Sequence, residues 1–138
     1  SAKAAGPNHE ITFKTNSDEV FVLGDSMRIH QAVSNLLANA RTHTPAGTKI
    51  NVEIVQSDSD VQISVSDNGP GLSQEDQLRI FERFFRADPS RARVSGEGSG
   101  LGLAIVDAVM KAHGGSVEVK SELGSGATFK IIFPQKDL

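Results

Sequence analysis

Apolar and polar residues alternate in several short runs of the chain, which is the pattern of strands with one buried face. Residues 11–13 and 20–22 form two such runs around a polar stretch and predict a short hairpin. Residues 50–54 and 61–65 predict a second, longer hairpin. Two last strands are expected on either side of the glycine-containing turn 124–126. Much of the predicted sheet is therefore built from hairpins.

Helical spacing replaces this alternation between the strands. After Asp25, a good N-cap, apolar residues between 29 and 40 recur at helical spacing and predict a helix that ends before Pro45. Ser73 and Asp76 have the spacing of a capping box. They predict a short helix with an apolar face made of Leu78, Ile80, Phe81, Phe84 and Phe85.

A third helix is predicted from Leu101, because the residues that follow are apolar nearly all round and therefore buried. It is expected to stop at Gly114 and Gly115 in a left-handed cap. Residues 86–99 are polar and have no period, so we interpret them as a mobile lid. Helices that alternate with strands, without an internal linker, predict one domain over residues 1–138. Its fold class is α/β, a two-layer sandwich with about three helices on one face of the sheet.

Composition narrows the possible functions. The 138 residues, 38% of them hydrophobic, are enough for a single core. The net charge of −3 offers no broad cationic surface, so we expect no nucleic-acid partner and only local binding of phosphate. The absence of cysteine rules out disulfides, thiolate metal sites and thiol catalysis. No run approaches a membrane span, and the opening Ser1, without a methionine, suggests a fragment of a longer protein.

The first chemical signal is the stretch Gly-Glu-Gly-Ser-Gly-Leu-Gly-Leu at residues 96–103, directly before the third helix. Alternating glycines leave backbone N–H groups unshielded, and the start of the helix adds unpaired donors and a positive dipole end. Such a segment fits a phosphate. Glycines also make ordinary turns, so the segment alone does not decide between the two interpretations.

Two asparagines give a second signal. Asn35 and Asn39 are four residues apart and so share one face of the first helix, at the rim of its apolar stripe. Solvated amides are the commoner interpretation. The alternative is a Mg²⁺ site, because an amide oxygen suits a cation that takes its other ligands from water and nucleotide phosphates.

Asp67 is the third signal. It is in phase with Val61, Ile63 and Val65, so its carboxylate points to the buried side if the pleat continues. An Asx turn is the competing interpretation, because Asp-Asn-Gly is a common turn sequence. An adenine amino group would satisfy a buried carboxylate, whereas guanine presents an acceptor at that edge and would be rejected.

The order of four motifs, Asn-(x3)-Asn, Asp-x-Gly-x-Gly, Phe-Glu-Arg-Phe-Phe-Arg and Gly-x-Gly-Leu-Gly-Leu, resembles the ATP-binding catalytic domain of two-component sensor histidine kinases. The resemblance covers nearly the whole chain. Together with the related gyrase, heat-shock chaperone and MutL ATPases, it implies a Bergerat-type ATP-binding fold. That fold is a mixed, mostly antiparallel sheet backed by helices, with ATP between the helices and a lid.

The resemblance also implies roles for single residues. Asn39 would bind Mg²⁺ with Asn35 as its companion, and Asp67 would read adenine. Gly69 and Gly71 would shape the floor under the base. The other positions implied to bind ATP are His43, at a Tyr or His position of the family, Gly98, Ser99, Gly100, Leu101, Gly102 and Leu103 around the triphosphate, and Thr128, which would help to close the adenine pocket.

Arg86 resembles a residue that reaches the γ-phosphate, although a solvated arginine is the alternative. The sequence departs from the family in three respects. Thr42 stands where a Lys or Arg is usual, and Glu97 where a further glycine is common. The phosphoacceptor histidine is absent, because none of the four histidines has its sequence context.

The resemblance implies that the domain binds Mg-ATP and donates the γ-phosphate to a histidine on a separate dimerisation domain of the same kinase, from which it passes to a response regulator. The implied catalytic residues are Asn35, Asn39 and Arg86. The fragment would be a monomer and the full-length kinase a homodimer, with this domain on the cytoplasmic side of a plasma-membrane sensor. The alternatives are an ATP hydrolase of the gyrase or chaperone type and a non-catalytic, nucleotide-dependent interaction module.

Overall fold

Five strands form a single sheet in the structure, a computed structural model that describes residues 9–16, 26–83, 85 and 102–134. The elements are β1 (Glu10–Thr15), α2 (Ser26–Thr42), β2 (Lys49–Gln56), β3 (Asp60–Asp67), α3 (Gln74–Arg79), α5 (Gly102–Ala112), β4 (Ser116–Ser121) and β5 (Ala127–Pro134). The strand order is β1-β2-β3-β5-β4. Only β1 and β2 pair in parallel among the described strands, which confirms the mixed, mostly antiparallel sheet.

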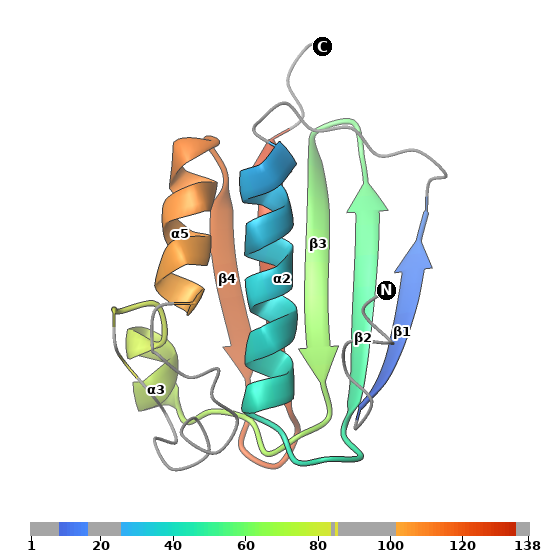
Figure 1. Ribbon diagram of the computed structural model, residues 1–138, viewed down its shortest axis with the longest axis vertical. Helices are drawn as coiled ribbons and strands as arrows, with labels where there is room; N and C mark the ends of the chain where they lie inside the picture. Colours follow the sequence, from blue (N-terminus) through green and yellow to red (C-terminus); the bar gives the residue numbers. More distant parts are fainter. Residues whose placement is uncertain (1–8, 17–25, 84, 86–101, 135–138) are drawn as a thin grey trace.

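The described helices lie on one face of the sheet, so the two-layer sandwich is confirmed (Figure 1). α2 crosses the middle of the sheet, and α5 lies beside it. α3 lies below α5 in this view, close to the end of α2 that carries Thr42 (Figure 1). The C-terminal end of α2 and the end of β3 therefore meet at the same edge of the sandwich.

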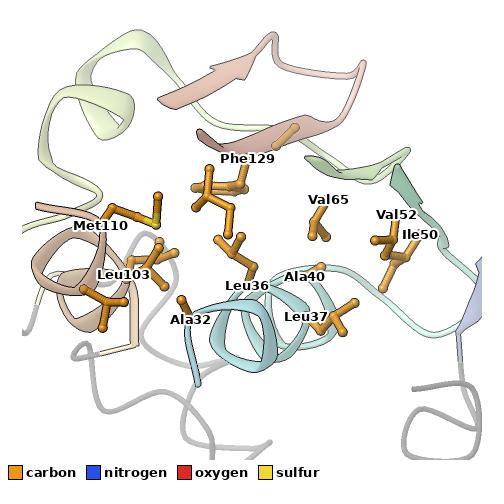
Figure 2. Packing of buried hydrophobic residues seen from close by; sticks show 14 of the residues in the cluster. Ala32, Leu36, Leu37, Ala40, Ile50, Val52, Val65, Leu103, Met110 and Phe129 are labelled. Carbon is orange, nitrogen blue, oxygen red and sulfur yellow. The ribbon is translucent and has the colours of Figure 1, made fainter. Parts of the chain in front are cut away.

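The core lies between the two long helices and the sheet (Figure 2). Leu36 of α2 and Val106 of α5 are both 0% exposed, because each sits on the helix stripe that faces the strands. Alternation along β5 puts every second side chain into the same layer. The other buried members include Ala32, Leu37, Ala40, Val52, Val61, Val65, Leu103, Val109, Met110, Phe129, Ile131 and Phe133.

The longer hairpin is confirmed. β2 and β3 pair antiparallel, and the turn between them closes with a hydrogen bond from the Ser57 amide to the carbonyl of Asp60 at 2.9 Å. Of the shorter hairpin only the first strand is described, and the hairpin itself stays a prediction, because residues 20–22 lie outside the described residues. β1 finds its described neighbour in β2, a parallel pairing that the hairpin prediction missed. Asp25 and the predicted lid, residues 86–99, also lie outside the described part of the chain.

The predicted cap of α3 is confirmed, since the Asp76 amide donates to the hydroxyl of Ser73 at 3.1 Å. The predicted apolar face of this helix is wrong. Leu78 is 87% exposed, and the helix ends at Arg79, before the aromatic residues. Phe81 lies beyond the helix and packs its ring edge-on against Phe129, with 6.3 Å between the centroids. A short turn, rather than a longer helix, thus delivers the aromatic side chains to the core.

α5 begins at Gly102 and ends as predicted, with Gly114 in the left-handed region at a φ of 72°. The amide of Gly115 donates to the carbonyl of Met110 at 2.8 Å and closes the last turn. Burial is confined to one side of the helix, and Ala108 is exposed. The expectation of burial nearly all round is corrected to that extent.

Candidate nucleotide site

A cavity of about 300 Å³ opens where α2 and β3 end and β5 begins. The loop after β3, the start of α3 and the β4–β5 hairpin complete its walls. This edge of the sandwich is the one at which the element ends meet in Figure 1. The lining residues are Asn39, His43, Thr44, Asp67, Pro70, Gly71, Leu72, Ser73, Asp76, Ile80, Leu123, Ala127 and Phe129.

Asp67 ends β3 and is one of the residues that line this cavity. Its Oδ1 accepts a hydrogen bond from the Gly69 amide at 2.9 Å, which is the Asx turn expected of Asp-Asn-Gly. Asp67 therefore both closes the Asx turn and lines the cavity. Burial raises the pKa of Asp67 and outweighs the backbone hydrogen bonds of Gly69 and Ala127 and the charge of His9, all of which lower it.

The glycines after Asp67 are required by close backbone contacts. Gly71 has a φ of 76° and lies against the backbone carbonyl of Glu122, so a side chain there is excluded both by conformation and by space. At Gly69, an added Cβ would lie 2.6 Å from Cγ2 of Thr44. Gly71 lines the cavity, whereas Gly69 does not contribute to its described wall.

Ser121 fastens the two loops of the cavity together, although no sequence motif singled it out. Its hydroxyl accepts from the Leu72 amide at 2.7 Å and donates to the carbonyl of Gly126 at 2.7 Å. The side-chain amide of Gln77 donates to the carbonyls of Leu72 and Ser121 at 3.1 and 3.0 Å. These bonds hold the β4–β5 hairpin beside the loop after β3.

The two predicted asparagines differ in position. Asn39 lines the cavity, one helical turn closer to it than Asn35, which is not among the lining residues. Both are half-buried, as expected at the rim of the core. Within the described part of the chain, Nδ2 of Asn35 is buried and has no hydrogen-bond partner. A buried amide donor without an acceptor is unfavourable, so this side chain has an unused capacity to donate a hydrogen bond.

The residues at the C-terminal end of α2 agree only in part with the contacts predicted from the sequence. His43 lines the cavity, as a nucleotide contact requires. Thr42 is 5% exposed, so its side chain is directed into the fold and supplies no charge at the site. Arg41, one position earlier, is not among the lining residues. The position at which the resemblance implies a Lys or Arg therefore has no cation here.

Thr128 is not brought to the cavity. Its hydroxyl lies 3.0 Å from that of Ser66, whereas the neighbouring residues Ala127 and Phe129 line the cavity. Side chains of a strand alternate between faces, so Thr128 lies on the opposite face of the sheet. The residue paired with Asp67 is Ala127. The residue that lines the pocket at this point is thus Ala127, one position before the predicted Thr128.

The phosphate-loop prediction is described only at its end. Arg86, Gly98, Ser99, Gly100 and Leu101 lie outside the described residues. Gly102 opens α5, and a Cβ added there would meet no atom of the described residues within 4 Å. Leu103 is 8% exposed and packs in the core, so its backbone, and not its side chain, is left to face a ligand (Figure 2).

The described residues contain no group of three or more His, Cys, Asp or Glu side chains placed to hold a metal ion. The amide of Asn39 is a neutral oxygen ligand of the kind that Mg²⁺ accepts when phosphates supply its other ligands. The cavity fits a metal that arrives with a nucleotide better than one held by the protein alone.

Comparison with known proteins shows the family of this chain. The family model described as histidine kinase-, DNA gyrase B-, and HSP90-like ATPase matches residues 24–137. The probable sensor histidine kinase TcrY of Mycobacterium tuberculosis is 46% identical over 123 residues, which cover 89% of this chain and 26% of TcrY. The sensor-like histidine kinase SenX3 of Mycolicibacterium smegmatis is 40% identical over 134 residues, which cover 96% of this chain and 35% of SenX3. The chain thus spans about a quarter to a third of the curated relatives it matches.

Solved structures show the same architecture. The mycobacterial sensor histidine kinase MprB has a TM-score of 0.80 and 29% identity, covering 99% of this chain and 90% of that one. Full-length ShkA in complex with AMPPNP has a TM-score of 0.79 and 32% identity, covering 96% of this chain and 28% of that one. ThkA in complex with the response regulator protein TrrA has a TM-score of 0.77 and 27% identity, covering 97% of this chain and 36% of that one.

None of the described helices is long and apolar enough to cross a membrane. The family match and the sensor-kinase relatives agree with a fold whose helices lie on one side of a mixed sheet and whose cavity lies at the ends of α2 and β3. The chain therefore belongs to the histidine kinase-, DNA gyrase B-, and HSP90-like ATPase family, as a catalytic ATPase domain of the sensor histidine kinase type.

Proposed function

We propose that this domain binds Mg-ATP in the cavity at the ends of α2 and β3 and donates the γ-phosphate to a histidine of a separate dimerisation domain. The observation that carries the proposal is that Asp67 and Asn39 line the same cavity of about 300 Å³. One is suited to a base amino group and the other to a metal on the phosphates. The volume lies at the lower end of the usual range for small-molecule sites.

Asp67 is proposed to select the base. Its carboxylate accepts hydrogen bonds and cannot donate them when ionised, so it favours the amino group of adenine over the carbonyl of guanine. The Gly69 amide holds one carboxylate oxygen and so fixes the direction of the group. Ala127, paired with Asp67 across the sheet, leaves room for a flat base beside it.

Asn39 is proposed to hold Mg²⁺, with Asn35 and His43 as further contacts to the phosphates. Asn39 and His43 line the cavity. Asn35 lies one helical turn farther from it and is kept as a proposed contact because its Nδ2 has no hydrogen-bond partner among the described residues. When bound, the metal neutralises charge on the phosphates. The side chains of α2 keep their places because Leu36 and Ala40 anchor the same helix in the core. Residues 98–103 and Arg86 remain proposed triphosphate contacts.

Asn35 also bears on the choice between transfer and hydrolysis. The resemblance implies that hydrolases of this superfamily place a Glu at this point of the helix to activate water. An amide has no basic group with which to take the proton from water. We therefore expect slow hydrolysis of ATP by water and transfer of the γ-phosphate mainly to a histidine nucleophile.

The partners are proposed from the relatives. Sensor histidine kinases of this type work with a response regulator, and ThkA is seen in complex with the response regulator protein TrrA. We propose that residues 1–138 form one catalytic domain of a longer membrane sensor, on its cytoplasmic side. We further propose that the domain itself is monomeric and that the whole kinase is a homodimer.

The test is transfer of radiolabelled γ-phosphate from ATP to the dimerisation domain of the same kinase, added as a separate protein. We expect label on the added domain only, in a form that acid removes and base does not, as is characteristic of phosphohistidine. A variant of the added domain without its histidine is the matched control. Rapid release of phosphate by the ATPase domain alone would support the hydrolase instead. ATP binding without transfer to a competent partner would support an interaction module.

A further inference from the structure

We propose that His9 and Thr44 are positioning residues of the nucleotide-base site, because together they hold the turn that carries Asp67. The inference rests on the proposed base-reading function of Asp67 and extends it to residues outside the shared motifs. His9 precedes the residues that the family model matches, 24–137. It lies just before β1, whereas Thr44 follows α2, so the contact joins distant parts of the chain.

The first step is the hydrogen bond between the two side chains. Nε2 of His9 lies 2.9 Å from Oγ1 of Thr44, and the same oxygen lies 2.6 Å from the carbonyl oxygen of Ala40. A carbonyl can only accept, so the single hydroxyl proton of Thr44 is committed to Ala40. The imidazole must therefore donate to Thr44. This requires a proton on Nε2 of His9 and fixes the tautomer of the neutral ring.

The second step leads from Thr44 to the Asp67 turn. Thr44 is 5% exposed and lines the nucleotide cavity. Its Cγ2 lies so close to Gly69 that a Cβ there would be 2.6 Å away. The amide of Gly69 in turn donates to Oδ1 of Asp67 at 2.9 Å. A shift of Thr44 would therefore move the donor that orients the carboxylate.

The contact with Thr44 needs only a proton on Nε2, which both the neutral and the protonated ring of His9 can supply, and the protonated ring would add an effect of charge on Asp67. Burial raises the pKa of Asp67, while a positive charge on His9 opposes that effect. The histidine thus favours the ionised carboxylate that an adenine amino group needs as its acceptor. Contact through Thr44 and charge act in the same direction.

The test compares His9→Ala, His9→Gln and Thr44→Val with the parent, and uses His30→Ala as the matched control. His30 is exposed on α2 and does not line the cavity. Calorimetry gives the Kd of Mg-ATP and of Mg-GTP, and thermal unfolding without nucleotide gives stability. We expect His9→Ala and Thr44→Val to weaken ATP binding roughly three- to tenfold while GTP binding changes little. The preference for ATP over GTP should therefore fall in both variants.

Two further measurements separate positioning from general stability. The side-chain amide of His9→Gln can donate to the Thr44 hydroxyl and should restore most of the ATP affinity. Nitrogen NMR of the imidazole should show the proton of neutral His9 on Nε2 in the parent, and a shifted tautomer equilibrium in Thr44→Val. A variant that combines His9→Ala with Thr44→Val should bind ATP only slightly more weakly than the weaker-binding of the two single variants, because both substitutions break the same hydrogen bond.

Equal ATP affinity and selectivity in the parent and His9→Ala would overturn the inference. Equal losses for ATP and GTP, together with a lower unfolding temperature, would also overturn it, since they would show a role in stability alone. A parent that binds no Mg-ATP would contradict the proposed function itself, and the inference would be refuted with it. A parent that binds ATP normally beside unaffected variants contradicts the positioning role only.

Discussion

Replacing Asp67 with Asn should separate nucleotide binding from folding. The side chain uses Oδ1 to accept a hydrogen bond from the Gly69 amide at 2.9 Å, and the amide oxygen of an asparagine can accept the same bond. The turn should therefore survive. What is lost is the negative charge and the second acceptor oxygen, which becomes a donor. A donor placed opposite the amino group of adenine repels it.

The expected loss of affinity follows from the kind of bond. A hydrogen bond to a charged group contributes about 1.5–3 kcal/mol, so Mg-ATP should bind roughly 10- to 150-fold more weakly. Stability should change in the other direction. Because burial raises the pKa of Asp67, the folded domain disfavours its ionised form, and a neutral amide removes that cost. The free energy of unfolding at neutral pH should stay the same or rise.

The pH dependence has a definite sign. The pKa of Asp67 is raised in the folded domain, so the stability gained on protonation is fully present below the unfolded pKa and is lost as the pH rises through the folded pKa. The advantage of Asp67→Asn should thus be largest near neutral pH and shrink in acid. ATP binding by the parent should weaken as the pH falls through the raised pKa, and the variant should lack this component.

Calorimetric titration with Mg-ATP and Mg-GTP, and denaturant unfolding at several pH values, measure both effects. The reasoning is refuted if the variant binds ATP as tightly as the parent does. It is equally refuted if the parent fails to prefer ATP over GTP, because the carboxylate would then not read the base. A variant that loses binding and also unfolds easily would show that Asp67 is needed mainly for the turn.

Three further substitutions test the metal site, the loop attachment and the core. Asn39→Ala should weaken ATP binding with Mg²⁺ present far more than with a chelator, and equal losses in calorimetry would exclude Asn39 as a metal ligand. Ser121→Ala should lower the free energy of unfolding by about 1–3 kcal/mol in denaturant titration, because Leu72 and Gly126 each lose a partner. Leu36→Ala should cost about 2–5 kcal/mol in the same titration, since Leu36 is fully buried.

Elements defined by local pattern were predictable from the sequence. The helical spacing of apolar residues predicts α2, and their alternation predicts β2 and β3. Both patterns depend only on residues that are close together in the sequence. The cap at Ser73 and the left-handed Gly114 depend on one turn of backbone. Burial of Asp67 followed from its phase with the strand before it.

Features that depend on distant parts of the chain were not predictable. Nothing in the residues of β1 specifies that it pairs in parallel with β2. The hydroxyl of Ser121 gains its importance only because two loops meet there. Periodicity also misplaced the end of α3, because apolar residues after Arg79 reach the core from a turn as well as from a helix.

Strand register explains why Asp67 lies on the cavity wall and Thr128 does not. Asp67 pairs with Ala127 across β3 and β5, so both side chains point to the same face. Gly126, at a φ of 86°, permits this pairing because its backbone lies against the carbonyl of Asp67, where any Cβ would collide. A slip of one residue would turn the carboxylate to the other face and bring a hydroxyl into its place. The glycine turn thus determines which chemistry enters the site, although it supplies no side chain of its own.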